Sequence, residues 1–179
     1  GEEFLPVFFL FPAENTVRQM TKEEQAIAAS KNGPVTVSSL TKDLRALGLR
    51  PGMVLIVHSS LSALGWVCGG PVAIILALQK LLRRYGTLVM PTHSGDMSDP
   101  SLWENPPVPK SWWETIRRTM PAYDPELTPS RGMGAVVECF RKLRSVVRSA
   151  HPQVSFAAWG EKALKIVQDH SLEFGLGEH

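Results

Sequence analysis

The pattern of apolar and polar positions is most regular between residues 53 and 82. Residues 53–57 form a short apolar run entered through an Arg-Pro-Gly turn, with the β-branched Val54 and Ile56 at alternate positions, and this predicts a buried strand. A loop rich in serine and glycine follows. Apolar residues then recur at intervals of three and four, which predicts a helix. The positions on this helix are Val72, Ile75, Leu76, Gln79 and Leu82.

The flanking segments extend this βα unit. Residues 87–90 form a second apolar run after Gly86, and two strands joined by a helix are expected to be parallel. Upstream, Ser38 or Ser39 is expected to cap a helix that stops at Gly48. One stripe of that helix consists of Leu40, Leu44 and Leu47.

The second half of the chain predicts three more elements. Residues 130–134 lead into a helix whose apolar positions are Val136, Val137 and Phe140. Two short strand-like runs lie on either side of His151. A helix is expected over residues 161–169, with Ala163, Leu164 and Val167 facing inward.

The ends of the chain differ from its middle. Residues 1–34 are expected to be a poorly defined extension with a short polar helix at 21–30, and residues 35–179 are expected to form one domain. The apolar stretch at 4–11 is interrupted by Pro6 and has the features of neither a secretory signal nor a membrane span. The chain stops in a glycine-rich loop, which predicts that a C-terminal part of the domain is missing.

Composition narrows the class of protein. The chain has 179 residues, of which 44% are hydrophobic and 20% charged, and these are ordinary values for a globular domain. The net charge of +2 is spread along the chain, so nucleic-acid binding is not indicated. Cys68 and Cys139 form no metal-binding or redox motif and suit the reducing cytoplasm. The five histidines lack HExxH spacing, so no metal is expected.

Two loops are candidates for binding an anion. The loop with Ser59, Ser60 and Ser62 follows a strand and precedes a helix, where free N–H groups and the helix dipole favour phosphate. The alternative is a plain βα connection, because the loop lacks GxGxxG, GxxxxGK[ST] and GxSxG motifs. Arg131 precedes a second helix start in a similar setting. The long loop at 91–109 is either functional or a surface excursion held by tryptophans.

His151 is the candidate for proton transfer. Pro152 restricts its backbone to extended geometry, and an imidazole held between two strands is suited to act as a general base. The alternative is an ordinary surface histidine.

Five segments in register resemble the aminoglycoside 3-N-acetyltransferase family. They read VHSSLSALGWVCGG, TLVMPTHS, WENPPVPKSWW, MPAYDPELTPSRGMGAVVECFR and RSAHPQVSFAAWG. The similarity covers residues 35–179, and WENPPVP and EFGLGE are most similar to a branch with uncharacterised Bacillus members. The resemblance implies an α/β fold, a mixed sheet with flanking helices, distinct from the common N-acetyltransferase fold.

The resemblance also implies a reaction and its residues. The reaction would be acetyl transfer from acetyl-CoA to the 3-amino group of an aminoglycoside, with both substrates bound together and His151 as the base. A carboxylate commonly orients such a histidine, and Glu178 and Asp124 are the candidates for this role. Aminoglycosides are polycations, so their pocket should contain carboxylates. Asp124, Glu173 and Glu178 are candidates for that pocket, and the alternative for each is a solvated acid in a loop. The residues expected to hold acetyl-CoA are Ser59, Ser60, Leu61, Ser62, Arg131, Gly132, Met133 and Gly134.

Other functions stay open at this stage. They are an inactive CoA-binding remnant, an acetyltransferase acting on another amine, and a serine hydrolase that uses Ser60 with His151. A homodimer is also an open option, and no membrane partner is expected.

Overall fold

The fold is built from a four-stranded sheet and six α-helices in the computed structural model, which describes residues 20–173 and residue 175. The strands are β1 Val54–Ile56, β2 Thr87–Pro91, β3 Val146–Arg148 and β4 Phe156–Gly160. The α-helices are α1 Lys22–Ala29, α2 Val37–Ala46, α3 Gly70–Leu82, α4 Trp113–Thr119, α5 Ala135–Arg141 and α6 Ala163–Val167. Three short 3₁₀ helices are η1 Leu61–Leu64, η2 Pro100–Leu102 and η3 Lys110–Trp112.

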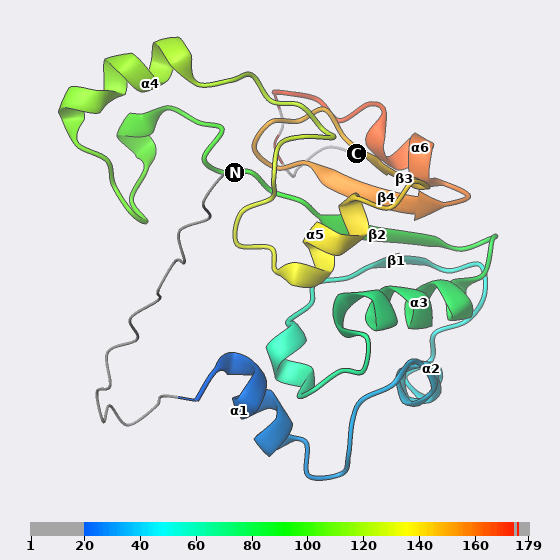
Figure 1. Cartoon of the computed structure of the whole chain (residues 1–179). Helices are drawn as coiled ribbons and strands as arrows, with labels where there is room; N and C mark the ends of the chain where they lie inside the picture. Colours follow the sequence, from blue (N-terminus) through cyan, green and yellow to red (C-terminus); the bar gives the residue numbers. More distant parts are fainter. Residues whose placement is uncertain (1–19, 174, 176–179) are drawn as a thin grey trace, which may run out of the picture.

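The sheet has the strand order β1-β2-β4-β3 (Figure 1). β1 and β2 are parallel and joined through α3, so the predicted βαβ unit is confirmed. β4 is antiparallel to both β2 and β3, and Pro91 at the end of β2 pairs with Phe156 at the start of β4. β2 lies inside the sheet, and all five of its residues are buried.

Helices cover both faces of the sheet. α2, α3 and α5 enclose the larger apolar core, which includes Ile75 and Leu82 of α3, Phe140 of α5, and Leu88 of β2. α6 lies on the other face over Val89 and Ala158, as Figure 1 also shows. Alternate residues of β2 therefore enter the two cores, as the two-residue period of a strand requires. The predicted mixed α/β sheet with flanking helices is confirmed.

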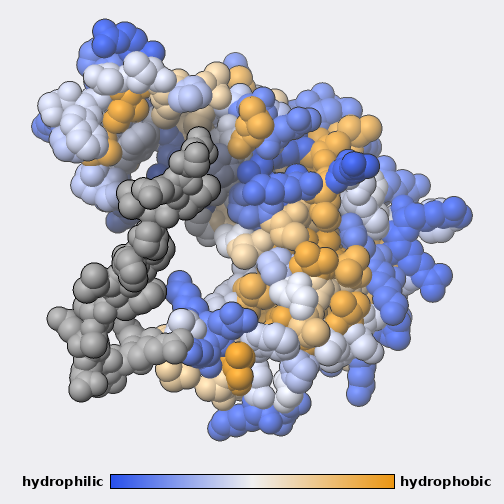
Figure 2. All heavy atoms as spheres, viewed as in Figure 1, coloured by the Kyte–Doolittle hydropathy of each residue, from blue (hydrophilic) through white to orange (hydrophobic). Residues whose placement is uncertain are grey.

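The prediction that residues 53–57 form a buried strand is wrong for one face. Val54 and Ile56 are 48% and 59% exposed, whereas Leu55 and Val57 pack against the larger core. The reason is that β1 is the edge strand and α6 packs against β2, β3 and β4. Val72 and Leu76 of α3 are also half exposed, and Figure 2 shows apolar side chains over this helix.

Three details of α2 and α6 differ from the prediction. The cap of α2 is Thr36, whose side chain accepts from the backbone of Ser39 in a capping box, so neither Ser38 nor Ser39 is the cap. Leu47 follows the last residue of α2 and is 80% exposed, although the stop at Gly48 is confirmed by its positive φ of 98°. Leu164 is 65% exposed, because the short α6 turns it away from buried Ala163 and Val167.

The segment between β2 and α5 leaves the sheet and carries α4, which stands apart in Figure 1. No pattern in the sequence had predicted α4. The segment is held by Arg117, whose Nε lies 2.8 Å from Asp99 Oδ2, and by Trp103, whose indole N–H donates to Ser98 Oγ. α1 is attached to the body of the fold through Ser30, whose Oγ accepts from the backbone N–H of Trp66 at 2.8 Å. Among the helices described, none is long and apolar enough to cross a membrane.

Where β2 pairs with β4, the backbone leaves no room for a side chain at Gly160. Its φ is 107°, and a β-carbon added there would lie 2.0 Å from the carbonyl oxygen of Gly86. We therefore expect Gly160→Ala to lower the free energy of unfolding by at least about 3 kcal/mol in urea denaturation, because backbone must move. Gly95→Ala is the matched control, since a β-carbon there meets open space. Equal stability of the two variants would contradict the prediction.

Candidate active site

Three loops meet at one end of the sheet. The first two follow β1 and β2, whose carboxyl ends lie together because the strands are parallel. The third joins β3 to β4 and carries His151; it reaches the same end because β4 runs antiparallel to β2. The second and third loops are joined directly, since Thr92 N–H donates to Ser155 O and Ser94 N–H donates to Gln153 O, both at 2.8 Å.

The loop before α5 completes this site. Arg131 N–H donates to His93 O at 2.8 Å, and a β-carbon at Gly134 would lie 3.8 Å from Ser59 O. The two segments expected to hold the cofactor, residues 59–62 and 131–134, therefore lie side by side. Ser60 Oγ and Ser62 Oγ are 3.2 Å apart, and Leu61 and Met133 pack against the core. Ser59 Oγ is buried and has no hydrogen-bond partner among the described residues.

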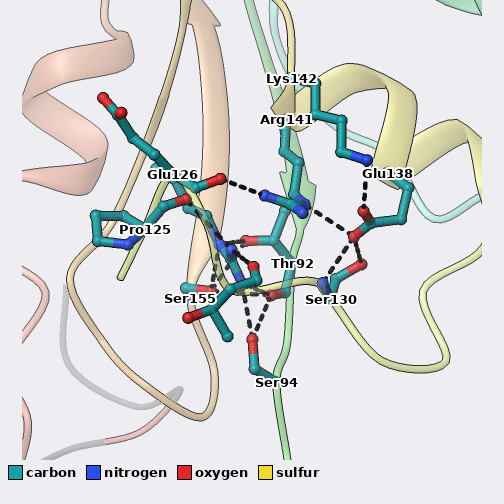
Figure 3. A network of polar contacts seen from close by, with 11 residues as sticks. Thr92, Ser94, Pro125, Glu126, Ser130, Glu138, Arg141, Lys142 and Ser155 are labelled. Carbon is teal, nitrogen blue, oxygen red and sulfur yellow. Dashed lines mark hydrogen bonds and ion pairs between the residues drawn. The ribbon is translucent and has the colours of Figure 1, made fainter. Parts of the chain in front are cut away.

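Glu138 fixes the shape of the loop before α5 (Figure 3). Its Oε1 accepts from the backbone N–H and the hydroxyl of Ser130, at 2.7 and 2.6 Å, and from Nε of Arg141 at 2.9 Å. Burial acts to raise the pKa of Glu138, but the hydrogen bonds from Arg141 and Ser130 outweigh it and lower the pKa to about 2. The carboxylate therefore remains charged at neutral pH and holds residues 130–134 against α5.

Arg148 connects the loops beneath the site. Its Nε donates to Thr92 Oγ1 and Ser155 Oγ at 3.1 and 3.0 Å. Its Nη2 donates to Thr92 O and Ser94 Oγ at 2.6 and 2.8 Å, and its Nη1 donates to the carbonyls of Pro125 and Thr128. All six acceptors found in the described part of the chain are neutral oxygens, several of them labelled in Figure 3. Burial lowers the pKa of this guanidinium, and the surrounding dipoles take the place of water.

His151 is buried, with only 4% of its surface exposed, so the alternative of an ordinary surface histidine is wrong. Its Nδ1 accepts the backbone N–H groups of Gln153 and Val154 at 3.2 and 3.1 Å. With its Nδ1 lone pair used in this way, the neutral ring carries its hydrogen on Nε2. Burial and neighbouring His170 both lower the pKa of His151, which keeps the ring neutral at pH 7.

His170 supports the ring of His151, although its sequence context gave no signal. The two ring centroids are 4.7 Å apart. His170 Nε2 lies 2.8 Å from Gly175 O, so this nitrogen carries a hydrogen, and Nδ1 lies 3.0 Å from Ser149 Oγ. Ser149 Oγ also accepts Phe156 N–H at 2.9 Å, which ties His170 to both ends of the loop carrying His151.

His93 is the second functional candidate that sequence reasoning missed. It follows β2 directly, and the predicted parallel pairing of β1 and β2 could have placed it near Ser59. Its ring meets Phe156 edge-on at 5.6 Å, and its Nε2 is buried with no hydrogen-bond partner in the described structure. Burial and the neighbouring His58, His170 and His151 lower its pKa.

These two histidines predict an acid-sensitive fold. His93 and His151 have lowered pKa values in the folded state, so the unfolded chain binds more protons near pH 6. Their contribution to stability is present above the unfolded pKa of about 6.5 and is lost as pH falls below it. We expect the free energy of unfolding to fall between about pH 7.5 and 5.5, and less steeply in His93→Gln. Urea titrations across this range give the slope, and an unchanged slope in the variant would contradict the assignment.

The three acidic residues predicted for the site differ in their surroundings. Asp124 Oδ1 accepts the backbone N–H groups of Glu126 and Leu127 at 2.7 and 2.9 Å, so it stabilises its own turn. The structure shows no contact of Asp124 with His151 among the described residues. Glu173 is exposed and follows His170, and Glu178 lies outside the described residues. No described group of three or more His, Cys, Asp or Glu residues is arranged to hold a metal ion.

Comparison with known proteins identifies the family. The sequence profile described as Aminoglycoside 3-N-acetyltransferase matches residues 56–179, which contain all three loops of the site. This chain belongs to the aminoglycoside 3-N-acetyltransferase family. The resemblance seen in the five sequence segments is thereby confirmed.

Relatives within the family reach high identity. The aminoglycoside N(3')-acetyltransferase-like protein YokD from the SPbeta prophage of Bacillus subtilis is 54% identical over 153 residues, which are 85% of this chain and 56% of YokD. Its crystal structure superposes with a TM-score of 0.84 at 51% identity, covering 87% of this chain and 57% of that one. Aminoglycoside N(3)-acetyltransferase VIII of Streptomyces fradiae is 39% identical over 83% of this chain and 51% of its own length.

Two solved structures of the family contain ligands. AAC-IIIb in a binary complex with CoASH has a TM-score of 0.66 and is 31% identical, and AAC-VIa bound to sisomicin has a TM-score of 0.65 and is 32% identical. In both comparisons the match covers 78% of this chain and 51% of the other. The chain thus spans about half the length of the relatives it matches.

Proposed function

We propose that this protein transfers an acetyl group from acetyl-CoA to the 3-amino group of an aminoglycoside. The observation that carries the proposal is His151, a buried and neutral imidazole at the point where three loops meet, within the residues that match the family. The family names of its relatives support the reaction, and the relatives solved with CoASH and with sisomicin support the two substrates.

The proposed cofactor side of the site is formed by residues 59–62 and 131–134. The close approach of Gly134 to Ser59 brings backbone of both segments to one place, and Ser59 Oγ offers a hydroxyl with no other use among the described residues. These groups suit the amides and phosphates of acetyl-CoA, which need donors in a fixed arrangement.

His151 acts at the reacting atoms. The acceptor nitrogen must be an uncharged amine to attack the thioester carbonyl; a C–N bond then forms, the C–S bond breaks, and one proton passes from nitrogen to the departing sulfur. A neutral imidazole can take up that proton and deliver it, which is the general-base role proposed for His151. Its low pKa favours the neutral form that this role requires.

The contacts at Nδ1 favour a second role for the same ring. With Nδ1 accepting two backbone N–H groups, Nε2 presents a hydrogen rather than a lone pair. An Nε2–H group would stabilise the oxyanion that forms on the thioester carbonyl. The base role instead requires the ring hydrogen to move to Nδ1, which breaks both backbone contacts. A hydrolase that pairs Ser60 with His151 is less well supported, since no hydrogen bond joins the two residues in the described structure.

The proposal is tested by thiol release from acetyl-CoA, measured with the purified 179-residue chain with and without kanamycin. Release that requires kanamycin supports the proposed reaction. Release with a simple amine but not with kanamycin would show that the acceptor is an amine other than this aminoglycoside. If coenzyme A raises the melting temperature but no thiol is released, the protein binds the cofactor without catalysing the transfer. The cytoplasmic location and a homodimer stay predictions.

A further inference from the structure

Four turns lie at the end of the sheet that is opposite to His151. They precede β1, β2 and β3 and follow β4, because β4 runs antiparallel to the other three strands. Backbone contacts join neighbouring turns, since Gly52 N–H donates to Leu82 O at 3.0 Å and Glu161 N–H donates to Gly86 O at 3.2 Å. We call these four turns the basic end, and they comprise residues 50–53, 83–86, 143–145 and 160–162.

The basic end carries five cations and a single carboxylate. The carboxylate is Glu161, and the cations are Arg50, Arg83, Arg84, Arg144 and Lys162. All six residues are exposed, and none of the cations forms an ion pair with a described residue. The fold therefore gathers charges that are spread along the sequence. Figure 2 shows hydrophilic side chains projecting from the right-hand side, where these turns lie in Figure 1.

Local backbone preferences do not account for two of these cations. Arg83 ends α3 with a φ of 56° and is, among the described residues, the one non-glycine with a positive φ. That conformation crowds a side chain, and glycine is the residue most often found there. Lys162 precedes the first residue of α6, where the helix dipole favours an anion. Both positions hold a cation against local preference, which points to a role outside the fold.

Apolar and aromatic side chains are exposed beside these cations. Tyr85 is 53% exposed, with the guanidinium of Arg84 4.6 Å from its ring centroid, and Met53 is 40% exposed. Leu47, three residues before Arg50, is 80% exposed. The surface of a bilayer accommodates this combination, because apolar groups enter the acyl boundary while Lys and Arg contact anionic headgroups. The phosphate backbone of a nucleic acid offers no apolar contact to Leu47 or Met53.

We propose that the basic end binds the surface of a bilayer that contains anionic lipid. Each Lys or Arg close to such a surface strengthens the attraction, and salt weakens it. The proposal departs from the expectation that the protein has no membrane partner, because residues distant in sequence form this surface. It does not depend on the acetyl-transfer reaction. The three loops around His151 lie at the other end of the sheet and would stay accessible on a bound protein.

The test is sedimentation of the full chain with vesicles made of equal parts of phosphatidylcholine and phosphatidylglycerol, in about 0.1 M salt. We expect binding to these vesicles and none to vesicles of phosphatidylcholine alone. Arg83→Gly should weaken binding about fivefold without lowering the melting temperature, because it removes one charge and relieves the positive φ. Adding Arg50→Gln and Arg144→Gln to this variant should weaken binding about thirtyfold or more.

Two further variants complete the set. Leu47→Ser should weaken binding about threefold, because it removes an apolar side chain and leaves the charge unchanged. Arg118→Gln is the matched control, since it removes the same charge from an exposed position on α4, and it should leave binding within about twofold. The melting temperature of each variant shows whether it is folded.

The outcomes decide between this surface and its alternatives. A loss of binding in Arg83→Gly and in the triple variant, with Arg118→Gln unaffected, supports the proposal. No binding to the anionic vesicles, equal binding to both kinds of vesicle, or an equal loss in Arg118→Gln would overturn it. Poly(U) RNA is titrated into the same proteins. RNA that binds more tightly than the anionic vesicles at equal phosphate concentration would overturn the proposal in favour of nucleic acid.

Discussion

Replacing His151 with alanine should lower the rate of acetyl transfer by a factor of about 10² to 10⁴, the range expected for loss of one proton-transferring or oxyanion-stabilising group. Coenzyme A binding should change little, because residues 59–62 and 131–134 remain in place. The measurement is kcat for thiol release, together with the shift in melting temperature that coenzyme A produces. Transfer that persists in His151→Ala would remove this residue from the mechanism.

A glutamine at the same position distinguishes the two roles of the imidazole. Its side-chain amide can donate a hydrogen bond from Nε2 but cannot take up a proton at neutral pH. If His151 acts as a base, His151→Gln should be as slow as His151→Ala. If it acts as a donor from Nε2, His151→Gln should recover at least about tenfold of the lost rate.

Replacing Arg148 with methionine should lower the free energy of unfolding by about 3 to 5 kcal/mol. Methionine has a similar length but no donors, so the oxygens of Thr92, Ser94 and Ser155, and the carbonyls of Pro125 and Thr128, would lose their shared partner. The ring of Tyr123 would also lose the guanidinium that lies 5.1 Å from its centroid. Urea denaturation followed by tryptophan fluorescence measures the change.

The matched control is Arg144→Met, which removes the same charge from an exposed position near the start of β3 and should change stability by less than about 0.5 kcal/mol. Arg148→Lys keeps the charge but replaces a planar five-donor group by three donors, so its stability should lie between the two. Equal effects of the methionine variants at positions 144 and 148 would show that the network contributes nothing specific.

Local pattern was sufficient for much of the fold. The βαβ unit, the strands around His151, and the buried face of α5 follow from apolar spacing and turn residues, which act over a few positions. The exposure of Val54 and Ile56 does not, because it depends on α6, which covers other strands and follows more than 100 residues later in the chain. α4 was missed because Trp112 and Trp113 gave no helical stripe, and it packs against η2 and η3 rather than the core.

The candidate site also combines features that local sequence predicts with features that depend on distant contacts. Ser59, Arg131 and His151 could be selected as candidates because they lie in short segments that resemble the family. His170 and Arg148 could not be found in this way, because their contacts are with partners distant in sequence: Arg148 contacts Thr92 and Thr128, and His170 contacts Ser149. Asp124 looked like a binding residue, but a carboxylate beside prolines also stabilises turns, and here it does so.

The pairing of β2 with β4 has a consequence for the order of folding. Thr92 and Ser155 are 63 residues apart in the chain, yet their hydroxyls lie 3.0 Å apart. Two loops of the site begin at this end of the β2–β4 pair. Closing so long a segment is slow, because its entropy must be lost before the new contacts stabilise it. We therefore expect the loops around His151 to reach their final arrangement late in refolding. A partly folded chain in which α2 already packs on α3 but β2 and β4 are not yet paired would lack the arrangement of loops around His151.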